Sequence, residues 1–113
     1  MSLLSFEEVK VNHDDNDDCK LEFRDGYLEL FYKYGKTHKS IPSTISSVLA
    51  RKLDMLNAAV ILNDVKSPPG NRLKKLNPPL EEYCSIRVND QYRLIFKWDS
   101  GVKGLYLDPH KDV

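Results

Sequence analysis

Two arginines on neighbouring predicted strands are the residues best suited to bind phosphate. Arg87 lies near the end of one segment of alternating apolar and polar residues, and Arg93 lies near the start of the next. Because successive side chains of a strand point to opposite faces, Arg87 is predicted to face away from Ile86 and Val88. A guanidinium group can hold two phosphate oxygens at once. A sheet with arginines on its open face is therefore a candidate phosphate-binding surface.

Other side chains nearby can contact phosphate or move a proton. Arg72, Lys74 and Lys75 form a basic run before these strands. On a strand Lys74 and Lys75 point to opposite faces, so at most one serves the site directly. His110 can act as an acid or a base near neutral pH, with Asp108 to orient it. Three residues from the C-terminus, His110 is also compatible with a frayed surface side chain.

Three strands are predicted to hold these side chains. They cover residues 83–88, residues 92–98 and a last segment ending at 108–110. A two-residue Asn89-Asp90 turn joins the first two strands, and a turn at 99–101 joins the last two. Alternation divides the side chains between two faces. The arginine-bearing faces carry Tyr83, Ser85 and Arg87 on the first strand, and Gln91, Arg93, Ile95 and Lys97 on the second.

Two helices and a short strand are predicted upstream. Residues 20–23 have the pattern of a strand. Apolar residues between Asp25 and Gly35, and again between Ile45 and Ala59, recur at helical spacing. The predicted order is strand, helix, helix and then three or four strands. This order is typical of an α+β fold with two helices packed on a mainly antiparallel sheet.

Composition indicates one soluble domain. The chain has 113 residues, of which 41% are hydrophobic and 30% charged. No apolar run reaches the roughly 20 residues of a membrane helix, and the N-terminus lacks the pattern of a signal peptide, so a cytoplasmic location is expected. Cys19 and Cys84 lie far apart without metal-ligand spacing, and are expected to be free thiols.

Charge divides the chain into an acidic N-terminal extension, residues 1–19, and a basic domain, residues 20–113. Their formal net charges are −5 and +5. The acidic run fails as a calcium loop of the EF-hand type, because counting from Asp14 puts Cys19 at the glycine position and Asp25 at the glutamate position. A solvated linker is expected instead. Basic domains attract polyanions, of which nucleic acid is the commonest.

Three segments carry a family resemblance: Ala50 to Ala59, Pro68 to Leu73 and Ser85 to Leu94. With them, the stretch from Lys20 to His110 resembles the HigB group of the RelE/ParE superfamily, the toxins of bacterial type II toxin–antitoxin modules. The resemblance implies a compact RelE-like fold and ribosome-dependent cleavage of messenger RNA in the A site, without a metal or other cofactor. It also implies a HigA-like helix-turn-helix antitoxin as partner, and contact with operator DNA only through that antitoxin.

The resemblance also assigns roles to residues. The residues expected to be catalytic are Arg93, Asp108, His110 and Asn77, of which Asn77 occupies the position where some family members have a histidine. The residues expected to contact RNA are Arg72, Lys74, Lys75, Arg87 and Tyr92.

Two departures from the family pattern bear on activity. The amide of Asn77 has no useful proton to exchange near neutral pH, and Pro109 replaces a tyrosine whose ring could stack on a base. Two alternatives to a nuclease therefore stay open. One is a toxin-like protein with weak or no cleavage that acts with the antitoxin as a co-repressor. The other is a ParE-like inhibitor of DNA gyrase.

Overall fold

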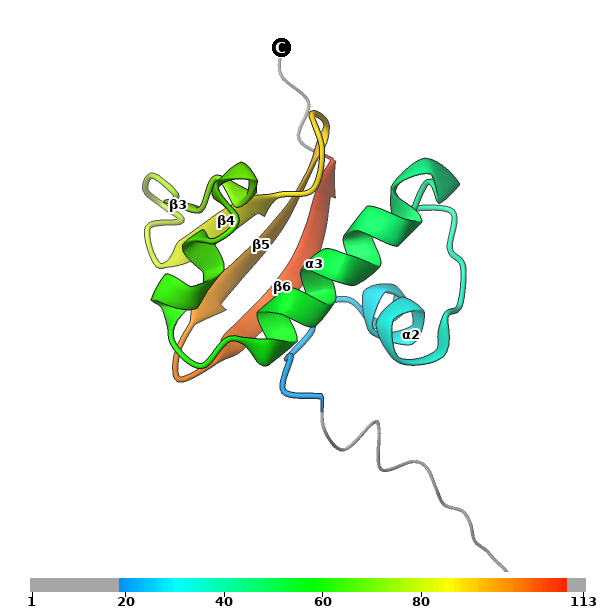
Figure 1. Cartoon of the computed structure of the whole chain (residues 1–113), viewed down its shortest axis with the longest axis horizontal. Coiled ribbons are helices and arrows are strands. Elements are labelled where there is room, and N and C mark those ends of the chain that lie inside the picture. Colours follow the sequence, from blue (N-terminus) through cyan, green and yellow to red (C-terminus); the bar gives the residue numbers. More distant parts are fainter. Residues whose placement is uncertain (1–18, 110–113) are drawn as a thin grey trace, which may run out of the picture.

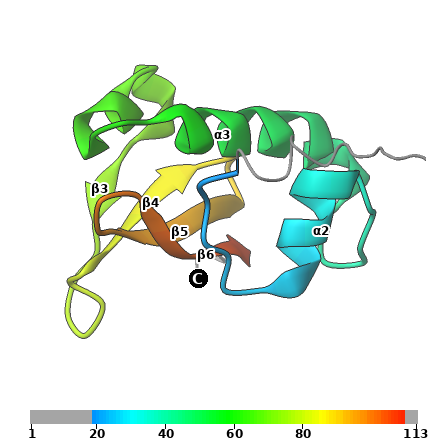
Figure 2. The same ribbon diagram turned by 90° about the horizontal axis from the view of Figure 1, so that it is seen from below.

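The computed structural model describes residues 19–109, which form one sheet with a helix across one of its faces (Figure 1). The helices are α2 (Gly26–Tyr34) and α3 (Ser46–Ala58). The sheet has the strand order β3 (Lys74–Lys75), β4 (Tyr83–Arg87), β5 (Tyr92–Trp98) and β6 (Val102–Pro109). Figure 2 shows α3 across one face and α2 on the β6 side, while no described helix covers the other face. The predicted α+β class is confirmed.

Helix α2 ends where the sequence predicts. Gly35 adopts a left-handed conformation with φ of 70°, and its N–H donates to the carbonyls of Leu30 and Phe31. Glycine reaches this conformation without the steric cost of a Cβ atom. Leu28 is buried, and the Tyr32 hydroxyl donates to Asp54 of α3 at 2.8 Å. The hydroxyl and the buried leucine attach α2 to the rest of the fold.

The core lies between α3 and the inner face of the sheet. The leucines of α3 recur at three- and four-residue steps and are all buried, as the sequence predicts. They share one cluster with alternate residues of the central strands. Each such side chain contributes roughly 1.5–3 kcal/mol of transfer free energy. The central members of this cluster are Leu49, Leu53 and Leu56 of α3, Cys84 and Ile86 of β4, Leu94 and Phe96 of β5, and Leu105 and Leu107 of β6.

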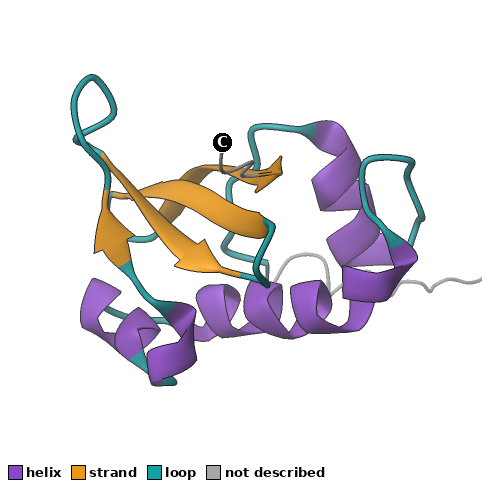
Figure 3. Cartoon of the chain, turned by 90° about the horizontal axis from the view of Figure 1, so that it is seen from above, coloured by secondary structure: helices purple, strands orange, loops and turns teal. Residues whose placement is uncertain are grey.

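All four strands pair antiparallel (Figure 3). Within the described residues both cysteines are free thiols, as expected. Burial raises the pKa of the Cys84 thiol, which lies on the core face of β4.

The strand predicted at residues 20–23 is reduced to a single parallel bridge between Phe23 and Leu105 of β6. Three backbone hydrogen bonds accompany it, and one runs from Arg24 N to Leu105 O at 2.8 Å. Gly104 has a φ of 59° at this point, so β6 is not extended enough for a regular ladder. The segment predicted as a strand is therefore extended only enough to form one bridge.

A buried amide fixes the connection between α3 and β3. The Asn71 side chain is fully buried, and its Nδ2 donates to the carbonyls of Val65 at 3.0 Å and Ser67 at 3.2 Å. Its Oδ1 accepts a hydrogen bond from Lys52 Nζ of α3. Arg72 follows in a left-handed conformation with φ of 49°. Asn71 therefore sets the direction in which the chain enters β3.

Asn71→Ala is expected to lower the free energy of unfolding by about 1–3 kcal/mol, because it leaves the carbonyl of Val65 buried without its donor and removes a second, partly buried hydrogen bond to Ser67. Asn63→Ala is the matched control, since Asn63 is exposed in the same connection and should change stability by less than about 0.5 kcal/mol. Urea unfolding of both variants measures the difference. Equal midpoints would contradict a structural role for the amide.

Gly104→Ala is expected to destabilise the protein by about 1–2 kcal/mol, because an L-residue with a Cβ is strained at this positive φ. Tyr83 lies 3.9 Å from the place where the Cβ would be, which is ordinary van der Waals contact, so the expected cost comes from the backbone alone. Gly26→Ala, at the open first position of α2, should instead be neutral or stabilising by up to about 1 kcal/mol. Thermal unfolding measures both variants. The midpoint temperature should fall for Gly104→Ala and should stay the same or rise for Gly26→Ala.

Candidate functional site

Three charged residues form a row across the face of the sheet that no described helix covers. Arg87 of β4 lies directly opposite Arg93 of β5, and Arg93 lies opposite Asp108 of β6. Residues paired in this way share a face and lie about 5 Å apart at Cβ. The expectation that Arg87 and Arg93 lie close to the same turn is confirmed.

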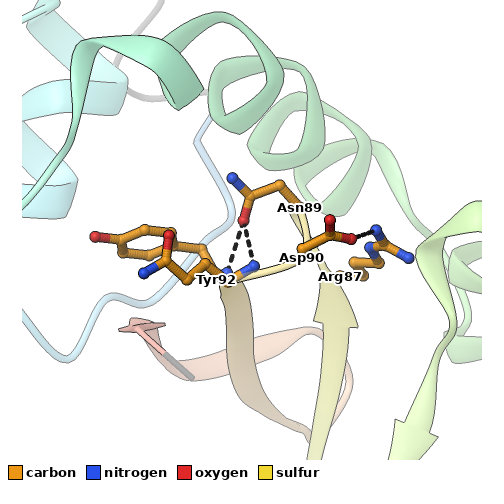
Figure 4. A network of polar contacts seen from close by, with 5 residues as sticks. Arg87, Asn89, Asp90 and Tyr92 are labelled. Carbon is orange, nitrogen blue, oxygen red and sulfur yellow. Dashed lines mark hydrogen bonds and ion pairs between the residues drawn. The ribbon is translucent and has the colours of Figure 1, made fainter. Parts of the chain in front are cut away.

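The turn between β4 and β5 occupies one of the two arginines. The Asn89 side-chain oxygen accepts from the backbone N–H groups of Gln91 at 2.8 Å and Tyr92 at 2.7 Å, and Arg87 forms an ion pair with Asp90 (Figure 4). The turn is longer than the predicted Asn89-Asp90 pair, because Val88 N also donates to Tyr92 O at 2.9 Å. The ion pair holds the Arg87 guanidinium at the turn, although Asp90 itself is exposed.

Two polar atoms on the same face are buried without a hydrogen-bond partner in the described structure: Arg93 Nη1 and Ser85 Oγ. Ser85 is fully buried and lies opposite Ile95, two positions along β5 from Arg93. Leaving a buried donor unsatisfied costs roughly 1–3 kcal/mol. Such atoms mark a place where a ligand oxygen can restore the missing bond.

Sequence reasoning placed Ser85 on this face but gave it no role. Its position on the same strand face as Arg87 was the feature of the sequence that could have suggested a role for Ser85. Its complete burial was not foreseeable from the alternation of polar and apolar residues, which predicts a face and not the exposed fraction of a side chain.

Two tyrosines accompany the charged row. Tyr106 of β6 lies opposite Ile95 and two residues before Asp108. The guanidinium carbon of Arg24 lies 3.6 Å from the centre of the Tyr106 ring. The pKa of Tyr106 is raised, first by burial and also by the carboxylate of Asp108, with Arg24 opposing the shift. Tyr83 of β4 reaches over Gly104 on the same face.

The predicted basic run reaches the site in part. Lys74 pairs with Ser85 and Lys75 pairs with Cys84, so the two lysines belong to opposite faces, as expected. Lys74 is therefore the one on the side of Arg93. Both lysines are exposed on the edge strand β3, and Arg72 is exposed just before it.

Two other predicted residues do not join the row, and a third lies outside the described structure. Tyr92 alternates to the inner face and packs against the core cluster, which separates it from Arg93. Asn77 is exposed in the connection from β3 to β4, where its carbonyl accepts from Leu80 N at 2.9 Å. His110 and most of the acidic extension, residues 1–18, lie outside the described residues.

A separate hollow lies near the β5–β6 turn. It is lined by both signs of charge, with Glu22, Glu82 and Asp99 facing Lys97 and Lys103. This balance favours an anion less than the arginine row does.

The described residues hold neither a metal-binding cluster nor a helix that could cross a membrane. Residues 19–109 contain no group of three metal-binding side chains of the types His, Cys, Asp and Glu. None of their helices has the length and apolar character needed to cross a membrane.

Comparison with known proteins gives the family. Residues 21–110 match the model of the RelE-like toxin of the type II toxin–antitoxin system HigB. Toxin HigB-1 of Vibrio cholerae is 54% identical over 92 residues, which cover 80% of this chain and 97% of that toxin. An uncharacterized protein of Haemophilus influenzae is 56% identical over 89 residues, which cover 78% of this chain and 88% of the relative. The chain therefore belongs to the HigB-like toxins of type II toxin–antitoxin systems.

Proposed function

We propose that this toxin is a ribosome-dependent endoribonuclease that cleaves messenger RNA in the A site. The observation that carries the proposal is Arg93, whose Nη1 is buried without a partner on the helix-free face, between Arg87 and Asp108 in the strand register. A phosphate oxygen supplies the acceptor that this nitrogen lacks. Family membership supports the activity, and implies a protein antitoxin as partner.

The reaction needs three groups around one phosphate. The 2′-oxygen attacks the adjacent phosphorus and loses its proton to a base, while the bond from phosphorus to the 5′-oxygen breaks and an acid protonates that oxygen. The products are a 2′,3′-cyclic phosphate and a 5′-hydroxyl. Arg93 stabilises the negative charge that builds on the phosphate, and Arg87 adds a second cation.

Proton transfer falls to the end of β6. Asp108 lies in the row with Arg93, and His110 follows two residues later in the sequence. A histidine can accept the 2′-hydroxyl proton or donate to the leaving oxygen near neutral pH. In this proposal Asp108 orients the imidazole or contacts the RNA.

Lys74 and Arg72 extend the cationic surface along the edge of the sheet, where they can contact neighbouring phosphates. The ribosome presents the messenger, so the protein acts in the cytoplasm. A HigA-like antitoxin neutralises it, and operator DNA is contacted only through that antitoxin.

Expression of the toxin without its antitoxin is expected to arrest growth and to create new, ribosome-phased 5′ ends in messenger RNA. Arg93→Ala should reduce cutting by about 100-fold or more, because removal of one preorganised donor typically costs ~10²–10³ in rate. Arg93→Lys keeps the charge but cannot hold two phosphate oxygens at once, so its cutting rate should lie between those of the wild type and Arg93→Ala. Mapping of 5′ ends measures all three.

Arg51→Ala is the matched control, since Arg51 is exposed on α3, away from the row. It should cut as the wild type does. Arrest without cuts would contradict the nuclease and point to another target such as gyrase. No arrest from well-expressed, folded protein would favour the co-repressor.

The co-repressor is the second candidate because Asn77 is exposed in a loop and Arg87 is already paired with Asp90. Asn77→His is expected to raise cleavage at least about tenfold, because a histidine supplies an exchangeable proton that an amide lacks. Asn77→Gln is the matched control and should leave the rate unchanged. An unaltered rate in Asn77→His, with Arg93→Ala inactive, would place position 77 outside the reacting groups.

A further inference from the structure

A planar stack stands beside the arginine row and is not used by the proposed chemistry. Arg24 lies over the Tyr106 ring at 3.6 Å, and Tyr106 shares its strand face with Asp108. Two residues along a strand span about 7 Å, a distance that a sugar and a base can bridge from a phosphate bound at Arg93.

The guanidinium plane of Arg24 is fixed before any ligand arrives. Its Nε and Nη2 donate to the two carboxylate oxygens of Asp25, both at 3.0 Å. Its backbone N–H donates to Leu105 O of β6 at 2.8 Å. The Arg24 side chain nevertheless stays 55% exposed. A flat, ordered group is thus presented to solvent next to the phosphate-binding row.

We propose that the Tyr106–Arg24 stack binds a nucleobase of the RNA strand, on the exposed side of the guanidinium plane. Guanidinium planes and aromatic rings both stack on bases, and stacking tolerates any base because every base has a π face. The edge atoms Nε and Nη2 are occupied by Asp25, so this subsite contributes affinity with little base preference. The inference rests on the proposed RNA substrate.

Charge separates this subsite from the row. The Arg24–Asp25 pair is close to neutral, whereas within residues 19–109 Arg93 forms no ion pair with an acidic side chain. Contacts to phosphate weaken steeply with salt, because bound counterions are released. Base stacking on a neutral pair weakens much less. Arg24 variants should therefore lower affinity without changing the salt dependence, whereas Arg93 variants should change both.

The competing explanation is that the Tyr106–Arg24 stack only stabilises the packing of residues 22–24 against β6 and binds no ligand. In that case its loss lowers stability but does not discriminate between ligands with and without bases. The test therefore needs two ligands that carry the same phosphates.

The experiment uses the full chain at low salt with a single-stranded RNA tetranucleotide and the same oligomer with abasic internal residues. NMR follows the Arg93 amide, the Arg24 Nε–Hε group and the Tyr106 ring. Both oligomers should shift Arg93, and only the intact RNA should shift Arg24 and Tyr106. The intact RNA should bind about tenfold more tightly, in the range of one base stacked on a side chain.

Arg24→Lys keeps the positive charge but loses the planar guanidinium group. The intact and the abasic RNA should then bind this variant with about equal affinity. Arg51→Lys, on the helix side, should leave it unchanged. Tyr106→Phe should retain the advantage, and Tyr106→Leu should lose it, which separates the ring from the hydroxyl.

Equal binding of the two oligomers, or an unchanged advantage in Arg24→Lys, would overturn the base subsite and leave the nuclease proposal intact if Arg93 still responds. Failure of both oligomers to bind would overturn the base subsite as a feature of the free protein, whereas the ribosome-dependent nuclease is overturned only by the absence of new 5′ ends in messenger RNA.

Discussion

The burial of one face of the sheet under α3 is the constraint on which the rest of the structure depends. Alternation in β4 and β5 sends Ile86, Leu94 and Phe96 towards the α3 leucines, and the same alternation sends Arg87 and Arg93 to the other side. A register shift of one residue would exchange the two sets. The hydrophobic core therefore fixes not only stability but also which side chains meet across the open face.

The order of the strands converts three separate sequence positions into one row. Because β4, β5 and β6 pair antiparallel through tight turns, residues 87, 93 and 108 become neighbours. The Asn89 side chain stabilises the first turn by accepting from two backbone N–H groups. The pairing of Arg87 with Asp90 belongs to that turn, so one arginine supports the scaffold while Arg93 keeps an unpaired nitrogen.

Sequence periodicity predicted most of the fold but only part of the site. The α3 leucines, the Gly35 terminus of α2 and the strand faces follow from spacing and local chemistry, and all are present. The bridge at Phe23 and the buried Asn71 were not predictable, because both depend on contacts between distant segments.

The same limit applied to the functional face. Arg93 was proposed from the family resemblance and the chemistry of its guanidinium, and alternation predicted only that one of Lys74 and Lys75 faces the site. The roles open to Ser85, Arg24 and Tyr106 depend on contacts between side chains that are distant in the sequence. Alternation places Tyr92 on the face opposite Arg93, and it packs against the core cluster there, so its expected contact with RNA stays a prediction.

The unpartnered atoms on this face carry a physical cost that binding can remove. Buried Arg93 Nη1 and Ser85 Oγ each forgo hydrogen bonds available in the unfolded chain, at roughly 1–3 kcal/mol per group. The core beneath them supplies the stability that tolerates this loss. In the proposed function a phosphate on the face restores an acceptor to the arginine, and part of its affinity would then arise from relief of that cost. Hydrogen-bond partners for Arg93 and Ser85 within the protein would raise its stability, but they would also occupy the atoms that the proposed function leaves for an anion.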